Sequence, residues 1–147
     1  MVAIDHGEDF FDALEKFCAQ YEIRAGHIPT LLGGFSSIRL VGCSEPLEHP
    51  ERPLWEEVEI TYPLEVFGSG TLAWNQETDQ LAPHIHVSAG IKEHSADGRT
   101  SHLLGGTVQF INELVVEEIA TPDITRLANP ELYGVPLLTF GDPAEGY

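Results

Sequence analysis

Residues 83–90 read Pro-His-Ile-His-Val-Ser-Ala-Gly and alternate polar with apolar side chains. This period of two predicts a β-strand that is covered on one face. Successive side chains of a strand point to opposite faces, so His84 and His86 project together and the apolar side chains project from the reverse. A connection from Gly90 onwards would return the chain along this strand and bring His102 beside the histidine pair.

His102 lies in a second informative stretch, Ser-His-Leu-Leu-Gly-Gly at residues 101–106. Three neutral imidazoles that converge from neighbouring strands form a common ligand set for a divalent metal ion, with positions left open for water or substrate. We therefore predict a metal site of His84, His86 and His102. Zinc is the first candidate, although iron, nickel and copper also bind imidazole. His94, in the connection, is a weaker fourth candidate ligand.

Length and composition predict one compact domain over residues 1–147, because 42% of the residues are hydrophobic and only 21% are charged. The start of the chain lacks the basic and apolar segments of a signal peptide, and no apolar run would span a membrane, so we expect a cytoplasmic protein. Seven Lys and Arg residues face 24 Asp and Glu residues, a net charge of −17. This charge disfavours direct binding to nucleic acid and favours metal or cationic partners.

The pattern predicts an α+β fold, with a mainly antiparallel sheet packed against one long N-terminal helix. Apolar residues recur at helical spacing from Glu8 to Tyr21. The other expected elements are strands at 25–28, 36–42, 58–62, 64–72 and 107–119, a turn at 33–34, an exposed loop at 43–56 and an irregular, Pro-containing strap at 120–147.

Two carboxylates are candidate catalytic residues because of their apolar surroundings. Glu65 is followed by Val66 and Phe67, and Glu113 lies among the apolar residues of the long strand at 107–119. Burial of an unpaired carboxylate is unfavourable, so each is expected to have a partner such as a histidine N–H, an arginine or a metal-bound water. Near a metal, either could serve as general acid or base. The alternative is a structural hydrogen bond or a partly exposed edge strand.

The order of the motifs resembles the PPC domain (plants and prokaryotes conserved). The resemblance covers about residues 7–140 and rests on short motifs, which are Gly7-Glu8-Asp9, Leu64-Glu65-Val66 with Gly68 and Gly70, His84-x-His86, residues 101–106, Glu113-Leu114-Val115-Val116, Arg126 and Leu138. It implies an α+β fold that assembles as a homotrimer. It also implies a bound metal on His84, His86 and His102. Plant members carry basic AT-hook segments beside the domain, and this chain has none.

Three functions are compatible with this resemblance. The first is a trimeric metal-binding module with a regulatory or ligand-sensing role, whose partners are the metal ion, other copies of the chain, and a small molecule or another protein. The second is a metal-dependent lyase or hydrolase, because the fold is similar to that of α-acetolactate decarboxylase, which uses three histidines and nearby carboxylates. The third is association with DNA through other chains, which the net charge of −17 disfavours.

Overall fold

The described chain is mostly β-structure with one short helix. The computed structural model describes residues 1–43, 55–91 and 94–141, and most of the loop expected at 43–56 lies outside these ranges. The elements, in chain order, are β1 (Val2–Asp5), α1 (Phe10–Gln20), β2 (Gly26–Cys43), β3 (Trp55–Ile60), β4 (Leu64–Asn75), β5 (Gln80–Ile91), β6 (His94–Glu118), β7 (Ile124–Asn129), the 3-10 helix η1 (Pro130–Leu132) and β8 (Val135–Phe140).

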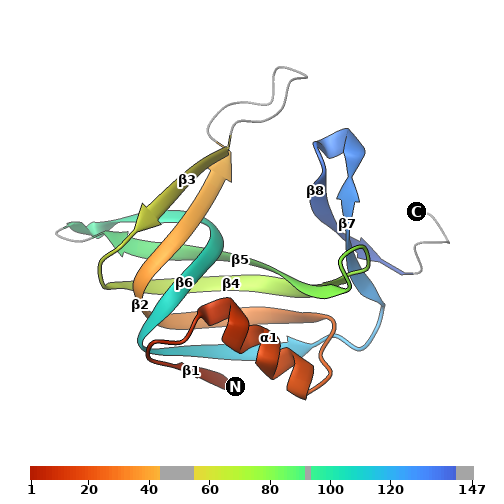
Figure 1. Ribbon diagram of the computed structural model, residues 1–147, viewed down its shortest axis with the longest axis horizontal. Helices are drawn as coiled ribbons and strands as arrows, with labels where there is room; N and C mark the ends of the chain where they lie inside the picture. Colours follow the sequence, from red (N-terminus) through yellow and green to blue (C-terminus); the bar gives the residue numbers. More distant parts are fainter. Residues whose placement is uncertain (44–54, 92–93, 142–147) are drawn as a thin grey trace.

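The strands form one sheet in the order β3-β2-β6-β5-β4-β7-β8, with β1 added alongside β6. Every pairing is antiparallel except the short parallel contact between β4 and β7, as the sequence predicted for most of the sheet. β2 also pairs with β4, so β2, β6, β5 and β4 form a closed ring of hydrogen-bonded strands. Figure 1 shows the long strands β2 and β6 bending sharply as they take part in this ring.

The helix α1 has 11 residues and is therefore not the long helix that the sequence predicted. The side chain of Asp9 caps its first turn by accepting hydrogen bonds from the backbone N–H groups of Phe11 and Asp12. At the other end, Tyr21 is the C-cap and Glu22 has a positive φ of 56°, which a helix cannot continue. Phe10 and Leu14 are fully buried and join the helix to the core of the sheet.

The turn expected at residues 33–34 is wrong, because β2 runs through both glycines as one strand. The register with β6 shifts between Gly33 and Gly34, which is a bulge. Gly33 has a φ of 152°, and a Cβ atom there would collide with the carbonyl oxygen of Ile111. The glycine pair therefore lets β2 bend while it passes close to β6.

The tail after residue 120 is also more regular than expected. It contains β7 and β8, which pair in register from Ile124↔Phe140 to Asn129↔Val135. In Figure 1 this hairpin stands at the end of the sheet away from β3. Among the described residues, no helix combines the length and the hydropathy that crossing a membrane would require.

Candidate metal centre

The histidine strand β5 has the predicted alternation of faces. Ile85, Val87 and Ala89 are at most 1% exposed and belong to the core. The side chains of His84 and His86 are exposed on the other face, which we call the outer face. Because three buried side chains fix the strand from within, the imidazoles are held in a row on its outer side.

β6 returns alongside β5 and places His102 directly opposite His86. The prediction that the returning chain brings His102 beside the pair is confirmed. Ser101, one residue earlier, donates a hydrogen bond from its hydroxyl to the carbonyl oxygen of Val41 on β2. His102 is therefore fixed between two strands and is only partly exposed.

Two glycines on β4 allow β5 to lie close on its other side. A Cβ atom at Gly68 would lie 2.5 Å from the carbonyl oxygen of His86, and one at Gly70 would lie 2.5 Å from that of His84. Any larger residue would force these backbones apart. Gly68 and Gly70 thus help to set the position of the two histidines.

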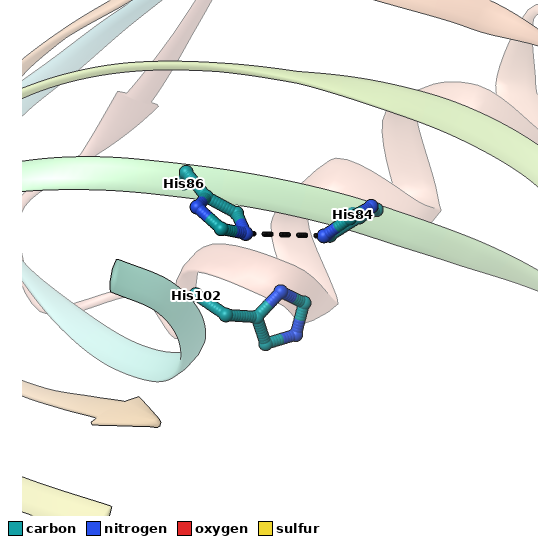
Figure 2. Close-up of side chains that lie close together, drawn as sticks. All are labelled: His84, His86 and His102. Atoms are coloured by element: carbon teal, nitrogen blue, oxygen red, sulfur yellow. Dashed lines mark hydrogen bonds between the residues drawn. The ribbon is translucent and has the colours of Figure 1, made fainter. Parts of the chain in front are cut away.

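The three imidazoles converge on one point, as Figure 2 shows. The Nε2 atoms of His84 and His86 lie 3.1 Å apart, and each of the three rings offers a nitrogen within 4.8 Å of the others. Two nitrogen ligands of a tetrahedral zinc ion are about 3.3 Å apart, given Zn–N bonds of about 2.0–2.1 Å. The first pair already has this spacing, and His102 offers a nitrogen within 4.8 Å of both.

The local environment favours the neutral form of His84 and His102. Partial burial of the ring, followed by the positive charge of Arg126 and the neighbouring His86, lowers the pKa of His84. Burial and the nearby His84, His86 and Arg126 lower the pKa of His102 to about 4. A neutral imidazole has a free lone pair, so proton competition for the His102 nitrogen is weak at neutral pH. The residues present therefore fit a divalent metal ion.

Arg126 on β7 lies near the histidines, a position that the sequence patterns did not predict, since Arg126 figured only in the family resemblance. Its side chain is 4% exposed, and its Nη2 donates a 2.6 Å hydrogen bond to Oγ1 of Thr71. Thr71 lies opposite His84 in the β4–β5 register. The segment was predicted as an irregular strap, so nothing placed Arg126 near the histidines. An arginine inside a short run of apolar residues was the available signal.

The two candidate carboxylates lie apart from the histidines within one chain. Glu65 is exposed on β4. It lies four residues, or about 13 Å along the strand, from Ser69, the residue that pairs with His86. Glu113 is exposed on β6 opposite Leu32. Neither belongs to the cluster of three histidines, and their catalytic role stays a prediction. The side chain of His94 lies outside the described residues.

Comparison with known proteins places the chain in a family. A sequence model of the Plants and Prokaryotes Conserved (PCC) domain, the PPC domain named above, matches residues 1–120. The chain belongs to this family. No curated protein matches the PPC chain.

Solved structures resemble the fold of this PPC protein over nearly its whole length. A metal-containing protein from Archaeoglobus fulgidus is 24% identical, with a TM-score of 0.77 and coverage of 94% of this chain and 90% of that one. A "putative DNA binding protein" from Bacteroides thetaiotaomicron is 22% identical, with a TM-score of 0.76 and coverage of 94% and 89%. A plant- and prokaryote-conserved protein from Pyrococcus horikoshii is 19% identical, with a TM-score of 0.75 and coverage of 92% and 88%. At these identities the likeness concerns the fold.

Proposed function

We propose that this PPC protein binds one divalent metal ion per chain on His84, His86 and His102, with zinc as the first candidate, and has a regulatory or ligand-sensing role. The observation that carries the proposal is the convergence of three histidine nitrogens within 4.8 Å. The structural relative from Archaeoglobus fulgidus is described as metal-containing, which supports the same reading. With three protein ligands, the ion keeps at least one position open for another molecule.

Elemental analysis of the purified, untagged protein tests this proposal. We expect about one metal ion per chain, and its loss in the double variant His84→Ala/His86→Ala. His27→Ala is a matched control, because His27 is exposed and lies next to Glu117, outside the cluster. Metal that persists in the double variant, or is absent from the wild type even after zinc is added, would contradict the proposal.

We also propose that the protein assembles as a homotrimer through its outer face. Leu32 on β2 and Phe67 on β4 are paired residues, and they are 43% and 60% exposed. Ile111 on β6 is 41% exposed and lies two residues from Glu113, which pairs with Leu32. Contiguous exposed apolar side chains on a soluble protein are typical of an interface.

The substitution Phe67→Glu tests the assembly. It places a charge in the apolar patch, so we expect light scattering after gel filtration to give the mass of a monomer. Phe140→Glu on β8 is the control, because Phe140 is 45% exposed but lies outside the patch. A trimer that survives Phe67→Glu would place the interface elsewhere.

The second candidate is a metal-dependent lyase or hydrolase acting on a small molecule. The exposure of His84 and His86 favours it, because a metal held there would be accessible to substrate. A bound ion would polarise a carbonyl group or lower the pKa of its water. In one chain neither Glu65 nor Glu113 lies in the cluster, so either of them would have to act from a neighbouring copy. If Glu113 carries a proton, Glu113→Gln abolishes turnover and retains the metal, and unchanged turnover excludes that role.

Direct DNA binding is a weaker alternative. Structural relatives described as putative DNA-binding proteins point to it, whereas the net charge of −17 opposes it. Electrostatic attraction to phosphates is strongest at low ionic strength. Gel-shift experiments in low salt should therefore show no complex, and a salt-sensitive shift would revive this alternative.

A further inference from the structure

The guanidinium group of Arg126 is buried and oriented beside the histidine cluster. Its Nε donates a 3.0 Å hydrogen bond to the carbonyl oxygen of Ala82, and its Nη2 donates to Oγ1 of Thr71. Ala82 lies two residues before His84 on β5, and Thr71 pairs with His84 across the sheet. Paired residues of an antiparallel sheet have Cβ atoms about 5 Å apart. The guanidinium is thus held against the residues that flank His84 on β4 and β5.

Both acceptors of Arg126 are uncharged, although its charge is buried. In the ranges that the structure describes, no carboxylate lies within 4.0 Å of the Arg126 guanidinium, and the ion pairs found there involve other residues. An arginine that is 4% exposed normally has an anionic partner, because an uncompensated buried charge strongly destabilises a protein. Arginine has five N–H donors, and the two hydrogen bonds leave three of them for another acceptor.

A metal ion would add to this positive charge. The three imidazoles are neutral when they ligate a metal, so they contribute no negative charge. A divalent ion and the guanidinium would together carry three positive charges, and among the residues that the structure describes no carboxylate joins the cluster to offset them. Such a site attracts an anion.

We propose that the metal site takes a small oxyanion, of carboxylate or phosphate type, that accepts hydrogen bonds from Arg126 while an oxygen of the same molecule occupies an open position of the metal. This inference rests on the proposed metal-binding function. It assigns Arg126 as the residue that selects anionic over neutral ligands. Arginine suits this role because its planar donors match the oxygens of a carboxylate or phosphate.

Titration of the cobalt(II)-loaded protein tests the assignment, because the visible spectrum of cobalt(II) changes with its ligands. The probes are glycolate, inorganic phosphate and glycolamide, which is a neutral analogue of glycolate. We expect glycolate or phosphate to change the spectrum. If glycolate is the preferred anion, glycolamide should bind at least about tenfold more weakly than glycolate. Binding of glycolate alone identifies a carboxylate site, and binding of phosphate alone identifies a phosphate site.

The substitution Arg126→Met removes the charge and retains much of the side-chain volume. Arg126→Met should still bind cobalt, but its affinity for the preferred anion should fall at least about tenfold, because a charge-assisted hydrogen bond is lost. Lys16→Met is the control, since it removes an equal charge from an exposed position on α1. Thr71→Val is a second variant in case Arg126→Met does not fold. Thr71→Val removes one hydrogen-bond acceptor of the guanidinium, so it should also lower the affinity for the anion.

The outcomes separate this inference from the proposed function. Cobalt that binds without any spectral response to either anion would overturn the role of Arg126 and leave the metal site standing. The role of Arg126 would also be overturned if the wild type and Arg126→Met bound the anion with equal affinity. The same holds if the protein binds glycolate and binds glycolamide equally well. Failure of cobalt to bind at all would remove both proposals, and the metal analysis detects that before any anion is added.

Discussion

The close approach of β4 and β5 predicts that a single methyl group at Gly70 disturbs the histidine site. In Gly70→Ala, the new Cβ atom would lie 2.5 Å from the carbonyl oxygen of His84 and 2.7 Å from Cγ1 of Ile85. Contacts of this kind below about 3.0 Å are essentially not observed, so the backbones must separate by about 0.5 Å. That movement would lengthen the hydrogen bonds between the two strands and shift His84.

The expected magnitude follows from two opposing terms. Overpacking of a close contact costs about 1–3 kcal/mol, whereas replacing glycine by alanine restores about 0.4–1 kcal/mol by restricting the unfolded chain. The net loss of about 1–2 kcal/mol would lower Tm by about 2–8 °C in a domain of this size. Metal ligands must stay within about 0.2 Å of their ideal distances, so we also expect the zinc affinity to fall about tenfold.

Thermal denaturation of the metal-free protein and competition with a zinc chelator measure the two effects. Gly90→Ala is the matched control on the same strand pair, because a Cβ at Gly90 would make only an ordinary contact, 3.7 Å from the carbonyl oxygen of Glu65. It should be neutral or slightly stabilising. If Gly70→Ala is as stable as Gly90→Ala and binds zinc equally well, the strands can relax freely and the steric argument is refuted.

Two further predictions concern acid stability and the helix. The pKa of His102 falls from 6.5 to about 4 on folding. Between pH 6.5 and about 4, the unfolded chain therefore binds a proton at this residue that the folded chain does not bind. The free energy of unfolding of the metal-free protein should decrease by at most about 3 kcal/mol over this range, and by less than that because His102 is partly exposed. Urea denaturation of the wild type and His102→Gln over this range checks it, and parallel pH profiles would contradict it. Asp9→Ala removes the cap of α1 and should cost about 1 kcal/mol, or about 2–4 °C in Tm, whereas Glu15→Ala on the exposed side of the helix should change little. Equal Tm values for these two variants would show that the cap contributes nothing.

The histidine cluster could be predicted because it depends on short-range regularities. The alternation of β5 puts His84 and His86 on one face whatever the rest of the fold does. The partner strand was close enough in sequence that a simple return of the chain brings His102 opposite His86. The placement of the three histidines therefore follows from strand periodicity and the return of one strand along its neighbour.

Other features depend on contacts that sequence patterns do not contain. The pair Gly33-Gly34 is typical of a turn, and only the approach of Ile111 from β6 explains why it forms a bulge in a continuous strand. The prolines after residue 120 suggested an irregular tail, yet one of them, Pro136, lies in β8, the last strand of the sheet, where a missing backbone N–H is tolerated. Such distinctions require knowledge of which strand lies beside which.

The candidate carboxylates illustrate a different limit. Apolar neighbours suggested that Glu65 was buried, but its neighbour Phe67 is itself 60% exposed in the single chain. Alternation along a strand identifies two faces and does not say which of them meets water and which meets another subunit. The sequence therefore overestimated the burial of a carboxylate whose surroundings are apolar and open.

The closed ring of β2, β6, β5 and β4 has a consequence for how the protein would exchange its metal. Because β5 is paired on both sides, its backbone is ordered by hydrogen bonds and its two histidines are positioned without a metal ion. Small zinc domains differ, since their chains fold only when the ion binds. If this protein binds a metal ion as proposed, binding and release of the ion would therefore leave its architecture intact.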